Sequence, residues 1–135
     1  MESYKILLVD DEANILRSMQ KTLLRAGYEV GTASSCVAGV EAFWSAQQAA
    51  EPFDLVVVDL NMPGFDGQEA PGAGLELLSR LIALQPTLPV IVLSAYDEVN
   101  KAKEAATRGA KGYCVKGREQ SLVEQIAAIL PPKGA

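Results

Sequence analysis

The feature that most constrains the fold is an unbroken apolar run that ends in a carboxylate. Residues 55–58 read Leu-Val-Val-Val, and Asp59 follows directly. A strand that is buried on both faces of a parallel sheet has this pattern, because neither of its faces is polar. The chain then turns at Pro63 and Gly64. We therefore expect Asp59 at the carboxyl edge of the sheet, where open α/β sheets bind ligands. The alternative role for such a residue is a helix N-cap or an Asx-turn.

Four other short apolar runs have the same character, and helical patterns separate them. We expect strands at residues 6–9, 28–32, 55–58, 90–93 and 111–115. Apolar residues at helical spacing predict helices around residues 13–24, 37–50, 75–84, 99–106 and 122–130. This alternation predicts the α/β class, as a (βα)5 doubly wound parallel sheet in a three-layer sandwich. The expected strand order is 2-1-3-4-5, the flavodoxin-like arrangement.

Composition narrows the class of protein further. The 135 residues fit one domain, and 12 Lys and Arg against 17 Asp and Glu, without a basic run, argue against a nucleic-acid surface. Cys36 and Cys114 lack metal-ligand spacing and there is no histidine, so we expect both to be small core residues. No signal-peptide pattern and no membrane-spanning apolar segment is present. We therefore expect a cytoplasmic protein.

Polar residues stand where four of the five expected strands end. They are Asp10 and Asp11, then Asp59, Ser94 and Lys116, after the first, third, fourth and fifth strands. The first and third strands are neighbours in the expected order, so their carboxylates meet in one crevice. Carboxylates this close repel by about 4 kcal/mol per pair near a protein surface. A hard divalent cation relieves the repulsion, and Mg²⁺ suits a small, open site.

These residue types suit phosphoryl transfer onto a carboxylate. Asp59 would be the nucleophile, while the cation and Lys116 neutralise the charge on the phosphoryl oxygens. The order of the motifs resembles that of receiver domains of two-component response regulators over essentially the whole chain. The motifs are an acidic pair after the first strand, Asp-Leu-Asn-Met-Pro-Gly-Phe-Asp-Gly after the third, Ser-Ala after the fourth and Lys after the fifth. The resemblance implies that Asp59 is the phospho-acceptor, and that Asp10, Asp11, Asp59 and the backbone carbonyl of Asn61 hold Mg²⁺.

The resemblance also implies a switch. Ser94 and Lys116 correspond to the hydroxyl and lysine that sense the phosphoryl group. Tyr113 corresponds to the aromatic switch residue, with a half-buried strand aromatic as the alternative, and Asn61 and Tyr96 would tune the phosphoryl lifetime. A hydrogen bond from Ser94 to the charged phosphoryl, worth roughly 1.5 to 3 kcal/mol, would shift the fourth helix. We expect that helix to pack thinly because its inward positions are small: Val99, Ala102, Ala105 and Ala106.

The partners implied by the resemblance are those of a signalling domain. A sensor histidine kinase or a histidine phosphotransfer protein would supply the phosphoryl group. The surface of the fourth helix, fifth strand and fifth helix would then control an unknown output domain or protein, or a phosphorylation-dependent homodimer. The chain would be no enzyme in its own right, but an acceptor that assists its own phosphorylation and dephosphorylation. We expect residues 1–130 to form this domain and 131–135 a tail or the start of a linker.

Two departures from the family pattern are visible. Gly117 replaces the usual proline after the lysine, which puts the aim of Lys116 in doubt. A cis bond without proline costs about 2.5 to 4 kcal/mol, so we expect a trans bond there. Residues Gln68 to Gly74 form an insertion before the third helix, interpreted as a tolerated surface loop or as a lid over Asp59.

Three other functions share part of this pattern. A phosphatase of the haloacid dehalogenase type also forms an aspartyl-phosphate, but its nucleophile normally lies in an Asp-x-Asp pair after its first strand. Here Asn61 replaces the second Asp, and the acidic pair precedes the nucleophile. A receiver-like interaction module that is not phosphorylated stays open because of Gly117. Flavin binding is disfavoured, since the carboxylates would repel a phosphate.

Overall fold

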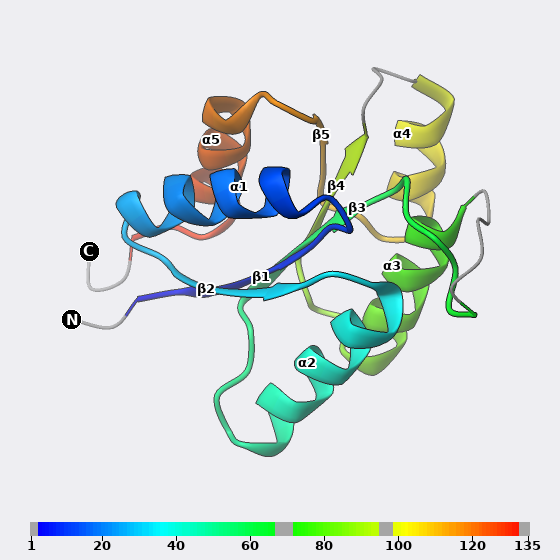
Figure 1. The fold of residues 1–135 in the computed structure, drawn as a ribbon, viewed down its shortest axis with the longest axis horizontal. Helices are drawn as coiled ribbons and strands as arrows, with labels where there is room; N and C mark the ends of the chain where they lie inside the picture. Colours follow the sequence, from blue (N-terminus) through cyan, green and yellow to red (C-terminus); the bar gives the residue numbers. More distant parts are fainter. Residues whose placement is uncertain (1–2, 67–71, 95–98, 133–135) are drawn as a thin grey trace.

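The computed structural model describes residues 3–66, 72–94 and 99–132 (Figure 1). Strands and helices alternate along this part of the chain. The strands are β1 (Lys5–Val9), β2 (Glu29–Ala33), β3 (Leu55–Asp59), β4 (Val90–Ser94) and β5 (Gly112–Val115). The helices are α1 (Ala13–Arg25), α2 (Cys36–Gln48), α3 (Ala73–Leu84), α4 (Val99–Thr107) and α5 (Glu119–Ile129). The predicted (βα)5 pattern is confirmed. No described helix is long and apolar enough to cross a membrane.

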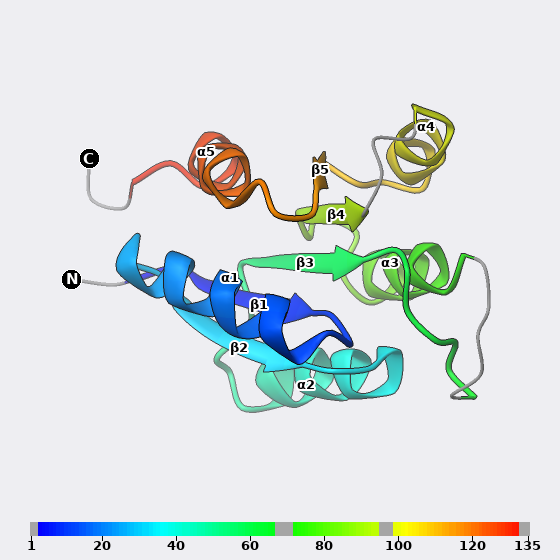
Figure 2. The same ribbon diagram turned by 45° about the horizontal axis from the view of Figure 1, so that its top comes forward.

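The five strands form one parallel sheet in the order β2-β1-β3-β4-β5, as predicted. Helices α1 and α5 cover one face, and α2, α3 and α4 cover the other (Figures 1 and 2). The register pairs Val9 with Val58 and Asp59 with Leu93, and Ser94 with Val115. The carboxyl ends of β1, β3, β4 and β5 therefore share one edge of the sheet. The start of β1 and the end of α5 lie toward the opposite edge in both views.

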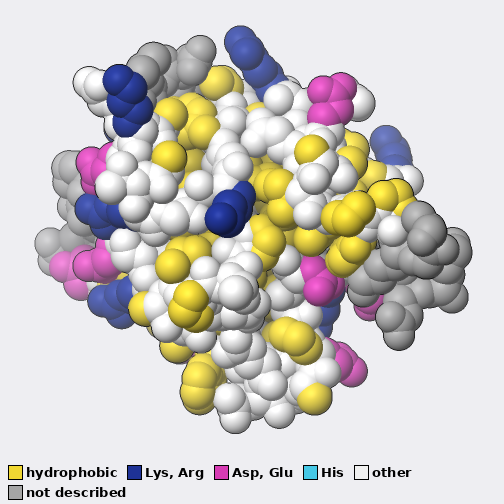
Figure 3. Space-filling model, turned by 180° about the vertical axis from the view of Figure 1, so that it is seen from behind, with side chains coloured by type: hydrophobic (Ala, Val, Ile, Leu, Met, Phe, Trp, Pro, Cys, Tyr) yellow, Lys and Arg dark blue, Asp and Glu magenta, His cyan; other side chains and the backbone are white. Residues whose placement is uncertain are grey.

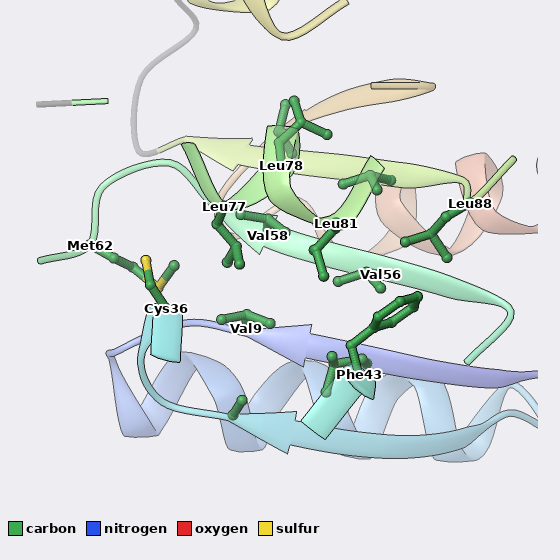
Figure 4. Packing of buried hydrophobic residues seen from close by; sticks show 14 of the residues in the cluster. Val9, Cys36, Phe43, Val56, Val58, Met62, Leu77, Leu78, Leu81 and Leu88 are labelled. Carbon is green, nitrogen blue, oxygen red and sulfur yellow. The ribbon is translucent and has the colours of Figure 1, made fainter. Parts of the chain in front are cut away.

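Each face of the sheet carries its own hydrophobic core, which explains why the strands read as unbroken apolar runs. Successive side chains of a strand point to opposite faces. Val56 and Val58 pack with Phe43 of α2 and with Leu77 and Leu81 of α3 (Figure 4). The other face packs Met19 and Leu23 of α1 and Leu122 and Ile126 of α5 against Ile6, Leu8, Leu55, Val57, Ile91, Leu93 and Cys114. Cys36 and Cys114 are buried free thiols, as predicted.

The start of α3 differs from the prediction. The helix begins at Ala73, so Ala73 and Gly74 belong to its first turn rather than to an inserted loop. Both residues are buried. A Cβ atom on Gly74 would lie 2.4 Å from the carbonyl oxygen of Asp59 and from Cα of Leu60. A glycine is required here because the helix meets the backbone of β3 directly. Gly72 is the N-cap residue of α3. Gln68 to Pro71 lie outside the described residues, so the interpretation of the insertion as a loop or a lid stays a prediction.

Helix α4 packs thinly, but not through all the residues that we expected. Ala105 is buried and Ala102 is half-buried, whereas Ala106 is exposed, so its inward placement was wrong. Successive residues of an α-helix lie about 100° apart around its axis, so Ala106 points away from the core position that Ala105 occupies. The side chain of Val99 lies outside the described residues. Among the described side chains of α4, only Ala105 is buried, which fits a helix with little holding it in place.

Candidate functional site

Three charged side chains from three strand ends meet at the carboxyl edge of the sheet. Asp10 follows β1, Asp59 ends β3 and Lys116 follows β5. The two carboxylates are fully buried, and the Lys116 side chain is only 6% exposed. Nζ of Lys116 lies 2.9 Å from Oδ2 of Asp59 and 3.2 Å from Oδ2 of Asp10. The convergence of these residues, predicted from strand order, is confirmed, and we call this trio the floor of the site.

Lys116 is aimed at the carboxylates although glycine follows it. Its backbone N–H donates to the carbonyl oxygen of Ser94 at 2.7 Å, which continues the pairing of β5 with β4 beyond Val115. Gly117 then takes a positive φ of 90°, a conformation that suits glycine. No cis peptide bond occurs in the described residues, so the predicted trans bond after Lys116 is confirmed. The sheet, rather than a proline, directs this lysine.

The two floor carboxylates are held in the same way by their own backbones. Oδ1 of Asp59 accepts a hydrogen bond from the backbone N–H of Asn61 at 3.0 Å. Oδ1 of Asp10 accepts one from the backbone N–H of Glu12 at 2.9 Å. The Asx-turn weighed as the alternative role of Asp59 is therefore present. The turn is compatible with a role of Asp59 at the site, because it uses Oδ1 and leaves Oδ2 to face Lys116.

Glu12 also contacts Lys116, which the sequence analysis did not predict. Its Oε1 lies 2.7 Å from Nζ of Lys116, and its side chain is 57% exposed. Only the acidic run at positions 10–12 hinted at it. We call the exposed groups above the floor the rim of the site: Asp11, Glu12 and Asn61.

Burial and the neighbouring charges have opposing effects on the pKa values of Asp10 and Lys116. Burial raises the pKa of Asp10 from 3.8 to about 6; the hydrogen bond from Glu12 lowers it, the Asp59 charge raises it and Lys116 lowers it. Burial lowers the pKa of Lys116, but hydrogen bonds to Glu12 and Asp59 and the charges of Asp59 and Asp10 raise it above its ordinary value. Lys116 is therefore protonated and positively charged at neutral pH. Asp10 is ionised at neutral pH, although burial disfavours its charged form.

The carboxylates fit a hard divalent cation. Asp10, Asp11, Glu12 and Asp59 each offer an oxygen within 4.8 Å of the others. Oδ2 of Asp10 is buried and accepts no hydrogen bond within the described structure, although the ammonium group of Lys116 lies 3.2 Å away as an ion pair. A bound cation would satisfy a buried carboxylate oxygen that accepts no hydrogen bond and belongs to an all-oxygen cluster. Mg²⁺, which needs few carboxylates because it keeps several waters, suits this acidic pocket.

The predicted switch residues lie on one face of the sheet. Ser94 is fully buried and follows Val90 and Val92 at the spacing of two that keeps side chains on one face. Tyr113 pairs with Val92 and packs, half-buried, against the core beneath α2 and α3. Asn61 is exposed, and its Oδ1 lies 3.4 Å from Nζ of Lys101 in α4. Tyr96 lies outside the described residues.

Comparisons with known proteins agree with this geometry. The profile of the response regulator receiver domain family matches residues 6–127. The response regulator FleR of Pseudomonas aeruginosa is 36% identical over 91% of this chain and 24% of its own length. The transcriptional regulatory protein PrrA of Mycobacterium leprae is 33% identical over the whole chain and 53% of its own length. This chain thus spans about a quarter and about half of these two relatives.

A solved structure is similar over nearly its full length. The response regulator TrrA of Thermotoga maritima, in complex with Mg²⁺-BeF, superposes with a TM-score of 0.78 at 29% identity, covering 94% of this chain and 99% of TrrA. The family profile covers far more than half of the chain, and the fold, the strand order and the acidic pocket are those expected from it. The chain therefore belongs to the receiver domain family of two-component response regulators.

Proposed function

We propose that this chain accepts a phosphoryl group on Asp59 from a sensor histidine kinase or a histidine phosphotransfer protein. The observation that carries the proposal is the position of Oδ2 of Asp59, which lies 2.9 Å from Nζ of Lys116 in a pocket of carboxylates. A carboxylate acts as a nucleophile when nearby positive charge can neutralise the phosphoryl oxygens. A turn fixes Oδ1 in both floor carboxylates, so Oδ2 has a defined direction in each, and that of Asp59 lies closer to Nζ of Lys116, at 2.9 Å against 3.2 Å for Asp10.

The remaining residues have supporting roles. Lys116 holds positive charge beside the acceptor, and the hydroxyl of Ser94 donates to a phosphoryl oxygen. Mg²⁺ would be held by Asp10, Asp11, Asp59 and the backbone carbonyl of Asn61, and when bound it neutralises charge on the phosphoryl oxygens. The structure of TrrA in complex with Mg²⁺-BeF supports this pairing. The chain would thus assist its own phosphorylation and dephosphorylation.

Intact mass after incubation with acetyl phosphate and Mg²⁺ tests the proposal. Wild type should gain one phosphoryl unit, and Asp59→Asn should gain none. Asp66→Asn is the matched control, because Asp66 is an exposed aspartate of the loop that follows Asp59, and it should gain the same unit as wild type. A wild type whose mass never rises would sink the proposal and favour a receiver-like module that is not phosphorylated. Steady turnover of a generic phosphate ester would favour the phosphatase.

The output surface is proposed to be α4, β5 and α5. Ser94 and Tyr113 face the α3 and α4 side of the sheet, and α4 has little buried surface, so a pull on Ser94 can move α4 at low cost. Hydrogen exchange of α4 amides, with and without phosphorylation, tests this. Wild type should show a change that Tyr113→Ala reduces or removes. An unchanged response in Tyr113→Ala would leave Tyr113 as a packing residue only.

The wider setting follows the family. We propose an output domain or partner protein, or a homodimer formed on phosphorylation, and a place in the reducing cytosol, which fits two buried free thiols. We propose residues 1–130 as the receiver domain and 131–135 as a tail or the start of a linker. The hydroxyl of Tyr4 donates to the carbonyl oxygen of Pro131, so residue 131 lies beside the residue that precedes β1.

A further inference from the structure

Lys116 has no donor to spare in this structure. An ammonium group has three N–H donors. Its partners are Glu12 at 2.7 Å, Asp59 at 2.9 Å and Oδ1 of Asp10 at 3.4 Å. The shortest of these bonds goes to Glu12, which is outside the set of residues assigned to phosphorylation. A phosphoryl oxygen that binds Lys116 therefore has to compete with these carboxylates for its donors.

Glu12 is the carboxylate that can leave most easily. The side chains of Asp10 and Asp59 are fully buried, whereas that of Glu12 is 57% exposed. Glu12 is the N-cap residue of α1, but its side chain makes no capping bond. Its backbone is anchored separately, because its N–H donates to Asp10 and its carbonyl oxygen accepts from the N–H of Leu16 at 3.0 Å. The side chain can therefore turn into solvent without disturbing the start of the helix.

We propose that Glu12 competes with the phosphoryl group for Lys116 and thereby limits phosphorylation of Asp59. In the unphosphorylated protein Glu12 binds the buried ammonium group of Lys116 from the rim of the pocket. Phosphorylation places nearly two negative charges on Asp59, which take over the bond to Lys116 and repel Glu12. This inference rests on the proposed function, since it requires Asp59 to carry the phosphoryl group.

Two variants separate the bond from the charge. Glu12→Gln removes the charge and weakens the bond, whereas Glu12→Asp keeps the charge on a side chain that is one carbon shorter and no longer reaches Lys116. The first measurement is the affinity for fluoroberyllate at saturating Mg²⁺, followed by ¹⁹F NMR. The second is the initial rate of phosphorylation by acetyl phosphate, followed by intact mass.

We expect both quantities to rise about fivefold in Glu12→Gln, the equivalent of about 1 kcal/mol and the upper value for an exposed ion pair. Glu12→Asp should show most of the same rise, because it also frees Lys116. A rise in Glu12→Gln alone would mean that charge at the rim acts without competition, and would overturn the inference. So would variants that match wild type.

Other outcomes point to other roles. Titration with Mg²⁺ alone, followed by thermal shift, shows whether Glu12 binds the metal. A tenfold or greater loss of Mg²⁺ affinity in both variants would make Glu12 a metal ligand and overturn the competition. A wild type that is never phosphorylated overturns the proposed function, and this inference with it. A wild type that is phosphorylated, alongside unchanged variants, overturns this inference alone.

Discussion

The floor and the rim of the site use the same chemical groups under opposite physical conditions. The floor carboxylates, Asp10 and Asp59, are fully buried at strand ends, and Lys116 balances them. The rim groups, among them Glu12 and Asn61, are exposed on the loops that follow. Buried charges depend strongly on their partners, whereas exposed charges are screened and change partners cheaply. Substitutions in the floor should therefore cost stability, and substitutions in the rim should change mainly rates and ligand affinities.

Removing the floor's positive charge should have the largest effect. Lys116→Met leaves two buried carboxylates without a counter-charge, so we expect a loss of about 3 kcal/mol in the free energy of unfolding of the metal-free protein at neutral pH. Denaturant unfolding measures this loss, and saturating Mg²⁺ should recover part of it. Lys111→Met is the control, because Lys111 is exposed, and it should change stability by less than about 0.5 kcal/mol. Equal losses in the two variants would show that the floor does not depend on Lys116.

The raised pKa of Asp10 predicts an unusual dependence of stability on pH. The pKa of Asp10 is 3.8 for an ordinary aspartate, as in the unfolded chain, and about 6 in the folded protein. The folded state therefore binds more protons than the unfolded state between pH 3.8 and about pH 6. Its contribution is fully present below about pH 4 and is lost as pH rises through 6, a fall of about 3 kcal/mol. Metal-free wild type minus Asp10→Asn, measured by denaturant unfolding at each pH, isolates this contribution. Saturating Mg²⁺ should remove the fall, since it favours the ionised carboxylate, and a flat difference without metal would contradict the prediction.

The glycine beneath the floor should be nearly as sensitive. Gly74→Ala places a methyl group 2.4 Å from the backbone of Asp59 and Leu60, so α3 must move away from β3. We expect a loss of about 1 to 3 kcal/mol in the free energy of unfolding and slower phosphorylation of Asp59. Gly39→Ala is the control, because its methyl group would meet side chains and no backbone atom, Val9 at 3.2 Å and Leu77 at 3.7 Å. It should cost less, and the reverse order would contradict the close approach of α3.

The rim should give the smallest change in stability. Asn61→Ala removes an exposed amide whose described side-chain contact is with Lys101 at 3.4 Å, so unfolding should change by less than about 0.5 kcal/mol. The backbone turn at Asp59 stays, because it uses the N–H of residue 61. The phosphoryl lifetime, followed by mass after removal of the donor, should still change, because this residue stands at the rim. A stability loss comparable to that of Lys116→Met would erase the difference between floor and rim.

Contacts within a layer were harder to foresee than the layers themselves. Ala106 was expected to face inward, but it is exposed. Alanine suits both buried and exposed positions, so it carries little information about the direction in which a helix faces. The first turn of α3 was assigned to a loop because Gly72 and Gly74 are typical of loops. The structure uses Gly74 for a close approach between backbones instead. Such an approach depends on where another element lies, which local propensity does not describe.

The sequence by itself determined the sheet, its strand order and the meeting of Asp10, Asp59, Ser94 and Lys116 at one edge. It could do so because buried parallel strands have apolar runs, and their carboxyl ends lie on the same side of the sheet. Only the tertiary structure decided that Glu12 shares Lys116, a partner 104 residues away. That bond depends on the direction in which α1 leaves β1 relative to the end of β5, and side-chain directions of this kind are set by packing rather than by pattern.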